Sequence, residues 1–410
     1  MQVCHQYLQG YIFTRYILVI FIIFIVGCQE KQLTIVAKLN QNWRILLKNN
    51  TPEESAYPLI QSGTSLMVRT DCEANSTFME IDLRNGRVIW EYLDTVEKKP
   101  LYYNLKPIRK DDSYIFPMGK KTKAIDYRTG KIKWSIKWQG APEQFLEAFG
   151  KYAVLQAVNN WEDRVSTINC FDIETGSVKF HYKMVWPDST KMIARTPIML
   201  TDSTVFFTSI TQNVYNRQTS AQWHILNTNS KSIILEGQAY LDNKFGYGVT
   251  KQPILYKGHV LLMSYDQFIC LDYNTGCEVW RTPFSRDMLT STPLVVDNAI
   301  FCALEDGYLY KLNIEDGHIL WKSKISGTPS RIEFCKGQLF LIGGGDGALY
   351  TIESSSGRLI RKMFAPNAAY HKNEFFRRFI GIDRDRLQIL LFDGYNYRSY
   401  NLNEDGSISH

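Results

Sequence analysis

Cys28 is the residue whose surroundings most clearly specify a chemical reaction. It follows Gly27 and an uninterrupted apolar run at residues 17–26, with Arg15 before the run and no acidic residue ahead of it. The run is too short to span a bilayer, which takes about 20 residues, and its pattern is that of a secretory signal. A thiol at this point would lie at the membrane surface, and the small glycine beside it would leave the neighbouring peptide bond accessible.

The segment Ile25-Val26-Gly27-Cys28 resembles the bacterial lipobox. The resemblance implies that the thiol is diacylglyceryl-modified, that residues 1–27 are a signal peptide removed by a peptidase, and that the new amino terminus is acylated. Several acyl chains would anchor the protein firmly, with residues 28–38 as anchor and linker. Gln29 in place of aspartate favours the outer membrane, on its periplasmic or surface face, by resemblance to lipoprotein sorting in Gram-negative bacteria. A signal anchor, or a secretory signal with a chance cysteine, stays open.

The rest of the chain contains none of the common catalytic motifs. There is no Gly-x-Ser-x-Gly segment, no His-Glu-x-x-His segment and no phosphate loop that leads into a helix. Residues 343–347 are rich in glycine but lie between two β-like runs, which predicts a turn. The histidines from residue 181 onward occur singly, so we expect no metal site. The six cysteines after Cys28 favour buried free thiols, although disulfides, including one between Cys270 and Cys277, stay open.

Composition and charge indicate an ordinary globular protein rich in β structure. Of the 410 residues, 45% are hydrophobic and 21% are charged, and the net charge is +6 without a long basic run. These values argue against a disordered chain and give no sign of nucleic-acid binding. The 24 Tyr, 22 Phe and 9 Trp favour strands, because aromatic side chains suit pleated, half-buried surfaces.

One hairpin pattern recurs along the chain at intervals of 40 to 54 residues. An alternating strand is followed by a polar turn that ends in glycine, and a large aromatic side chain follows four residues later. Asp or Asn at the entrance can accept backbone hydrogen bonds, and the glycine can adopt a positive φ. We expect the aromatic residue to fill the gap between neighbouring sheets. The repeat residues are Asp82, Gly86, Trp90, Asp126, Gly130, Trp134, Asp172, Gly176, Phe180, Asp272, Gly276, Trp280, Asn313, Gly317, Trp321 and Gly357. An eroded copy has Ser230 in the glycine position, and the last copy ends at Gly406.

This spacing predicts a single all-β domain at residues 39–410, an eight-bladed β-propeller of four-stranded antiparallel blades. Such units cannot bury both faces alone and therefore stack into a closed ring. The chain ends soon after Gly406, so the last blade lacks an outer strand. Residues 42–47 can supply it from the amino terminus. Seven blades remain the alternative if the eroded copy is not a blade.

The segment Ala124 to Trp134 resembles the signature of the pyrroloquinoline-quinone-type (PQQ-like) propeller repeats, which is matched in part at the other seven positions. Quinoprotein dehydrogenases share these repeats, and so does the propeller lipoprotein of the outer-membrane β-barrel assembly machine, to which this chain is similar. The resemblance implies a non-catalytic scaffold that binds envelope or outer-membrane proteins as a monomer. The repeat therefore predicts the fold more strongly than it predicts any reaction.

Two other functions stay open. A PQQ-dependent oxidoreductase would need PQQ stacked near the axis over a calcium ion held by six to eight oxygen ligands. The large quinoprotein alcohol dehydrogenases carry adjacent cysteines against the cofactor, and this chain has no Cys-Cys pair. We therefore predict neither PQQ nor calcium and no enzymatic activity. A propeller that binds a glycan or small ligand in its axial funnel is the further alternative.

The most plausible binding surface is one face of the ring. In a propeller, the connections between blades and the turns between second and third strands share a face. The longest insertions belong to this class, and they carry aromatic and arginine side chains, which supply much of the binding energy of interfaces. The candidate residues are Trp161, Arg164, Tyr215, Arg217, Tyr247, His371 and Arg377.

Overall fold

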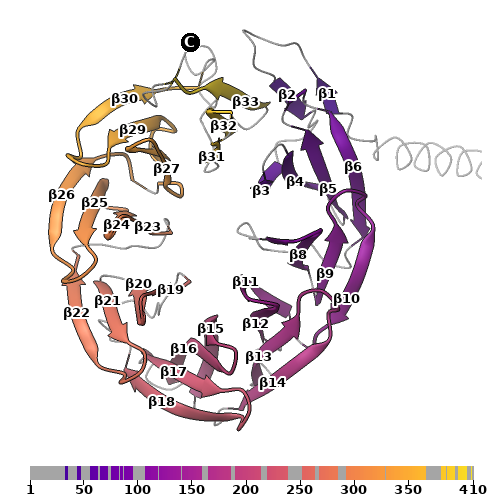
Figure 1. Cartoon of the computed structure of the whole chain (residues 1–410), viewed down its shortest axis with the longest axis vertical. Helices are drawn as coiled ribbons and strands as arrows, with labels where there is room; N and C mark the ends of the chain where they lie inside the picture. Colours follow the sequence, from indigo (N-terminus) through magenta and orange to yellow (C-terminus); the bar gives the residue numbers. More distant parts are fainter. Residues whose placement is uncertain are drawn as a thin grey trace, which may run out of the picture.

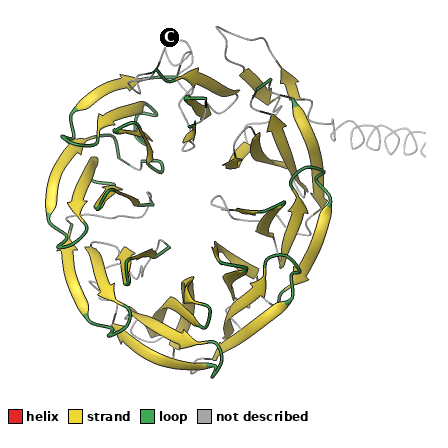
Figure 2. Ribbon diagram, in the orientation of Figure 1, coloured by secondary structure: helices red, strands yellow, loops and turns green. Residues whose placement is uncertain are grey.

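The computed structural model is a ring of eight β-sheets around a central axis (Figure 1). No helix occurs among the residues that the structure describes, and thus no helix there is long and apolar enough to cross a membrane (Figure 2). The described residues are 33–35, 44–47, 56–62, 65–72, 75–82, 84–85, 87–95, 107–118, 120–139, 141–158, 165–185, 190–213, 219–238, 252–263, 267–284, 292–327, 329–365, 380–384, 386–392, 396–403 and 408.

Seven blades are built from four consecutive antiparallel strands each, in sequence order from the axis outward. Blade 1 comprises β3 (Ala56–Ser62), β4 (Ser65–Cys72), β5 (Asn75–Asp82) and β6 (Val88–Thr95). Blade 2 comprises β7 (Ile108–Lys110), β8 (Ser113–Met118), β9 (Lys121–Asp126) and β10 (Ile132–Lys137). Blade 3 comprises β11 (Ala141–Phe149), β12 (Tyr152–Val158), β13 (Val165–Asp172) and β14 (Val178–Val185). Blade 4 comprises β15 (Thr190–Thr201), β16 (Thr204–Asn213), β17 (Thr219–Asn227) and β18 (Ser232–Gln238).

The next three blades have shorter strands. Blade 5 comprises β19 (Ile254–Tyr256), β20 (His259–Met263), β21 (Gln267–Asp272) and β22 (Glu278–Pro283). Blade 6 comprises β23 (Leu294–Val296), β24 (Ala299–Ala303), β25 (Tyr308–Asn313) and β26 (Ile319–Lys324). Blade 7 comprises β27 (Glu333–Cys335), β28 (Gln338–Ile342), β29 (Leu349–Glu353) and β30 (Leu359–Met363).

Blade 8 joins the two ends of the chain. Its carboxy-terminal strands are β31 (Ile380–Asp383), β32 (Gln388–Phe392) and β33 (Asn396–Asn401), and β2 (Arg44–Leu47) pairs antiparallel with β33. The prediction of eight blades closed by an amino-terminal strand is confirmed, and the seven-blade alternative is wrong. A further strand, β1 (Leu33–Ile35), pairs with β2 and makes this sheet five-stranded. The sheet therefore begins inside the segment that the sequence assigns to the linker.

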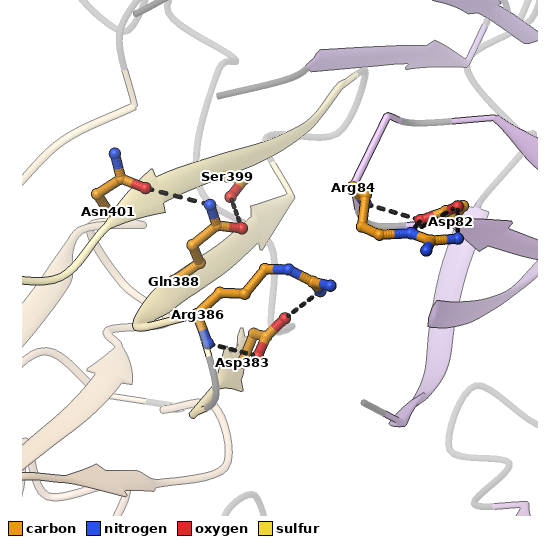
Figure 3. Close-up of polar contacts among 7 residues, drawn as sticks. All are labelled: Asp82, Arg84, Asp383, Arg386, Gln388, Ser399 and Asn401. Atoms are coloured by element: carbon orange, nitrogen blue, oxygen red, sulfur yellow. Dashed lines mark hydrogen bonds and ion pairs between the residues drawn. The ribbon is translucent and has the colours of Figure 1, made fainter. Parts of the chain in front are cut away.

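A group of charged side chains lies where blade 8 meets blade 1 (Figure 3). In the turn after β31, the Arg386 guanidinium donates to Asp383 Oδ2 at 3.0 Å. In the turn after β5, Arg84 Nε donates to both carboxylate oxygens of Asp82, at 2.9 and 3.0 Å. The hydrogen bonds from Arg84 hold the pKa of Asp82 below its usual range, and the charge of Arg386 contributes to the same shift. Arg386 thus links the last blade electrostatically to the first.

The middle strands of the blades are buried on both faces, because each blade packs between two neighbours. Strand β24 is buried along its whole length, and β13 is buried at every residue except the last. The apolar core is divided among the boundaries between blades. One cluster joins blades 5 and 6, and another joins blades 6 and 7. The outer strands are half exposed, as in β30. Continuous apolar runs in the middle strands are therefore required by the ring.

In the described turns that follow third strands, the first side chain accepts hydrogen bonds from the residues of the turn. Asp126 Oδ1 accepts hydrogen bonds from the backbone N–H groups of Arg128 and Thr129 at 3.0 and 2.9 Å. Gly130 closes the turn with φ +69°, and its N–H donates to the Asp126 carbonyl. The same arrangement recurs at Asp172, whose pKa is lowered mainly by the N–H of Thr175. A positive φ favours glycine because it has no Cβ.

Each described glycine that closes such a turn also lies against an indole of the preceding blade. A Cβ on Gly130 would lie 2.8 Å from Trp90 Cδ2, and Gly176 has the same relation to Trp134 at 2.7 Å. Trp134 Nε1 donates to the carbonyl of Ile173 in the next blade at 3.0 Å. Trp280 packs against Gly317 and Trp321 against Gly357 in the same way, although only Trp280 donates its indole N–H, to the carbonyl of Ile314 at 3.0 Å. Phe180 packs in the core between blades 3 and 4. Each of these aromatic residues thus spans a blade boundary.

Blade 4 departs from the repeat in two ways. Asn227 Oδ1 accepts hydrogen bonds from the N–H groups of Asn229 and Ser230, as Asp126 does from the second and third residues after it. Asn227 is therefore the turn entrance, and the residue four positions later, where Gly130 stands in blade 2, is Lys231. Lys231 has φ +55°, which shows that it, and not Ser230 as the sequence suggested, occupies the glycine position. The indole at the next boundary comes from Trp223 on the third strand. It crosses Gly237 and lies against Gly276, where added Cβ atoms would be 2.6 and 2.7 Å from the ring.

We predict that Gly130→Ala destabilises the protein more than Gly150→Ala. Both glycines have positive φ, but a Cβ on Gly150 would meet no atom within 4 Å, whereas a Cβ on Gly130 would meet the Trp90 ring. Backbone strain costs each variant about 1–2 kcal/mol, and overpacking adds about 1–3 kcal/mol at Gly130. Thermal melts of the two variants measure the difference. Equal losses of melting temperature would show that the indole contact does not constrain this position.

Candidate functional site

The antiparallel order of the blades places two sets of loops on opposite faces. Turns between the third and fourth strands lie on one face, together with turns between the first and second strands. Turns between the second and third strands share the other face with the connections between blades. We call this second surface the loop face. It bears the segments between β12 and β13, β16 and β17, β18 and β19, and β30 and β31.

All seven candidate binding residues belong to these segments but lie outside the described residues. Trp161 and Arg164 fall between β12 and β13, and Tyr215 and Arg217 fall between β16 and β17. Tyr247 follows β18, and His371 and Arg377 precede β31. The described strands show that the ends of these segments meet the same face of the ring. The arrangement of their side chains stays a prediction.

Blades 3 and 4 are built differently from the later blades beneath the loop face. Strand β15 has 12 residues and β16 has 10, whereas the corresponding strands of blade 6 have 3 and 5. Pairing of β15 with β16 continues from Thr201↔Thr204 to Thr190↔Asn213. Since a strand residue rises about 3.3 Å, this hairpin extends well beyond the short blades. The turns that connect β12 to β13 and β16 to β17 therefore start from strands longer than those of blade 6.

Buried polar side chains line the boundary between blades 3 and 4. Val154, Ile168 and Phe207 form part of the apolar core there, and strand alternation places Gln156, Ser166, Ser209 and His224 on the same faces. Gln156 Nε2 donates to Ser166 Oγ at 3.1 Å, while Gln156 Oε1 has no hydrogen-bond partner among the described residues. Buried polar atoms of this kind are commonly satisfied by ordered water. Sequence reasoning missed this layer, because its residues become neighbours only through strand pairing.

Ser209, His224 and Glu236 in blade 4 are arranged like the serine, histidine and carboxylate of a hydrolytic triad. His224 Nε2 lies 2.8 Å from Ser209 Oγ, and its Nδ1 lies 3.3 Å from Glu236 Oε2. However, Ser209 is completely buried and His224 is 4% exposed. Burial lowers the pKa of His224, so the imidazole is held neutral against the Phe207 ring. A nucleophile must reach its substrate, so this geometry supports packing rather than hydrolysis.

The described thiols and carboxylates can be compared with the needs of a metal ion. Among the described residues, no three His, Cys, Asp or Glu side chains are placed to share a metal ion. Cys170, Cys270, Cys302 and Cys335 are buried free thiols, and Cys277 is an exposed one. Burial raises the pKa of Cys170 to about 11, which disfavours the reactive thiolate.

Glu80 is a buried carboxyl group at the boundary between blades 1 and 2. It is 0% exposed and accepts a hydrogen bond from Tyr114 Oη at 2.8 Å. The Arg109 guanidinium lies 5.8 Å from the centre of the Tyr114 ring, so one positive charge is nearby. Burial dominates and raises the pKa of Glu80 to about 7. The folded protein therefore retains a proton there that the unfolded chain would release.

The repeat and the closed ring together define this chain as a PQQ-like β-propeller. The chain belongs to the family described as outer membrane protein assembly factor BamB, whose sequence model matches residues 34–222 and 221–373. No curated protein matches the sequence significantly. The family suggests a scaffold without enzymatic activity.

Solved structures share the fold at low sequence identity. The crystal structure of BamB from Moraxella catarrhalis is similar over 90% of this chain and 99% of that chain, with 14% identity and a TM-score of 0.58. The computationally designed Ika8 protein has the same coverage and identity, with a TM-score of 0.56. The C-terminal WD40 domain of Sif2 covers 92% of this chain and 99% of its own, with 10% identity and a TM-score of 0.59. These likenesses establish the propeller architecture alone.

We predict that the Glu80→Gln variant loses less stability than the wild-type protein when the pH is raised. The carboxyl has a pKa near 4.5 when unfolded and about 7 when folded, so its contribution falls through this window by about 3 kcal/mol in total. Melting temperatures at pH 5 and pH 8 should therefore differ less in the variant than in the wild type. Exposed Glu315→Gln is the matched control and should behave as the wild type. An unchanged pH dependence in Glu80→Gln would contradict the assignment.

Proposed function

We propose that this chain is a lipid-anchored, non-catalytic propeller that binds other envelope proteins and takes part in outer-membrane protein assembly. The observation that carries the proposal is the family match over residues 34–373. The ring supports it, because the turns that carry four of the candidate binding residues start on the loop face from the long strands of blades 3 and 4. Interfaces of this kind use aromatic and arginine anchors on a fixed scaffold. The partner is expected to bind the loop face.

The proposed anchor places the chain on the bacterial outer membrane through Cys28. Its support is the apolar run and the lipobox-like segment that precedes the cysteine. The described part of the ring provides a separate surface for partners, so anchoring and binding need not compete. A monomeric propeller suffices for both.

We predict that Cys28→Ala abolishes acylation. Metabolic labelling with a fatty-acid analogue, followed by purification, should give a labelled wild-type protein and an unlabelled variant, because no other thiol follows a lipobox-like segment. Cys277→Ala removes an exposed free thiol and should leave the label unchanged. Persistent lipid on the Cys28 variant would refute the anchor.

Affinity purification tests the binding function. Detergent-solubilised, carboxy-terminally tagged protein should recover specific envelope proteins, including components of outer-membrane assembly. Combined Trp161→Ala and Arg164→Ala substitutions on the loop face should reduce that recovery by about tenfold or more, as expected for loss of interface anchors. The control is Arg128→Ala on the opposite face, whose side chain is mainly exposed.

Two results would count against this function. Repeated purification without a specific envelope protein would remove its basis. An equal loss of recovered envelope proteins in the loop-face variant and in the Arg128→Ala control would show that the partner does not bind specifically to the loop face.

A further inference from the structure

Blade 7 has an arginine where most other blades have the aromatic residue of the repeat. Blades 1, 2, 5 and 6 carry tryptophan four residues after the turn glycine, and blade 3 carries phenylalanine. In blade 7 the same position, four residues after Gly357, is Arg361. Arg361 pairs with Thr351 of the third strand, as Trp321 pairs with the third strand of blade 6. Because a guanidinium is charged and needs hydrogen-bond acceptors, the apolar filling of the boundary between blades 7 and 8 must come from elsewhere.

Ile408 supplies an apolar side chain at this boundary. It is 4% exposed and belongs to the core cluster that joins blades 7 and 8. Two contacts hold its backbone: it forms an isolated β-bridge with Leu402, and its carbonyl accepts a hydrogen bond from Arg361 Nη1 at 2.8 Å. The arginine that replaces the aromatic residue therefore positions the isoleucine that packs into the boundary.

Two further arginines connect blades 7 and 8. Arg331 Nε and Nη2 donate to the carbonyl of Ile380 at 2.9 and 2.6 Å, and Arg384 Nη2 donates to the carbonyl of Phe334 at 3.1 Å. Both guanidinium groups also lie near the carboxylate of Glu333, at 3.1 and 3.6 Å. The two arginine side chains are 39% and 61% exposed, so water competes for these contacts. This boundary thus depends on polar contacts at the surface and on Ile408 in the core.

We infer that the ring opens first at the boundary between blades 7 and 8, and that Ile408, held by Arg361, is the latch of this boundary. In the open state the Ile408 side chain leaves the core cluster and blade 8 separates from blade 7. The other described boundaries keep their aromatic contacts. Opening of one boundary breaks fewer contacts than global unfolding and therefore costs less free energy. The inference depends neither on the proposed lipid anchor nor on the proposed binding function.

Labelling of buried thiols in the full chain tests where the ring opens. Cys335 lies in the same core cluster as Ile408, whereas Cys170 lies between blades 3 and 4 and Cys302 between blades 5 and 6. A buried thiol reacts only when its surroundings open. The protein is incubated with N-ethylmaleimide without denaturant, and modification of each cysteine is followed by mass spectrometry. Cys335 should react about tenfold or more faster than Cys170 and Cys302.

Two variants test the latch itself. Ile408→Ala should accelerate labelling of Cys335 by about tenfold or more and leave Cys170 and Cys302 unchanged, because the cavity weakens only one boundary. Arg361→Met should have a similar effect. The double variant should react no faster than the faster of the two single variants, since both substitutions release the same contact.

Arg358→Met is the matched control, because it removes a mainly exposed arginine from the same hairpin of blade 7. It should label as the wild type does. If Ile408→Ala does not fold, Ile408→Val should give a smaller acceleration that is still confined to Cys335. Equal acceleration of all three buried thiols, or of none, would show that Ile408 is not a latch. Labelling of Cys335 no faster than that of Cys302 in the wild type would overturn the proposed opening point.

Discussion

The ring depends on an indole that lies against a residue without a side chain. Sheets that radiate from one axis diverge toward the circumference, and a large aromatic ring fills the space that opens there. Trp134 does this between blades 2 and 3, where it covers Gly176 and donates its N–H to the carbonyl of Ile173. The glycine must supply both a positive φ and an empty Cβ position. Each blade is thus completed by its neighbour, and the stability of the ring is collective.

Blade 4 shows how this constraint can be met by other residues. Lys231 adopts the left-handed conformation without glycine, and Trp223 reaches the next boundary from a different strand. The Trp223 indole lies directly over Gly237 of β18, where any larger residue would place a Cβ in contact with the ring. The geometry of the boundary is therefore preserved while the sequence pattern is lost.

The sequence predicts the fold well because the repeat itself reflects the contacts between blades. Spacing of the Asp-to-Gly turns defines eight units, and the missing last strand indicates closure by residues 42–47. The prediction loses accuracy where a contact has no local pattern. Residue type alone favours Ser230 for the glycine position, whereas the hydrogen bonds of Asn227 determine the register. Strand β1 is too short to be recognised without its partner, and the polar layer around Gln156 depends on pairing between distant segments.

Closure through β2 and β33 has a consequence for the order of folding. Arg44 of β2 pairs with Arg398 of β33. Strand β2 is synthesised early but cannot pair until β33, one of the last strands, has been synthesised. Contacts this distant in sequence slow folding, because a long loop must close before they form. Until then the nascent ring has two open sheet edges, which are sites of misassembly. The blades can form one by one, but the circle is completed only after nearly the entire polypeptide is available.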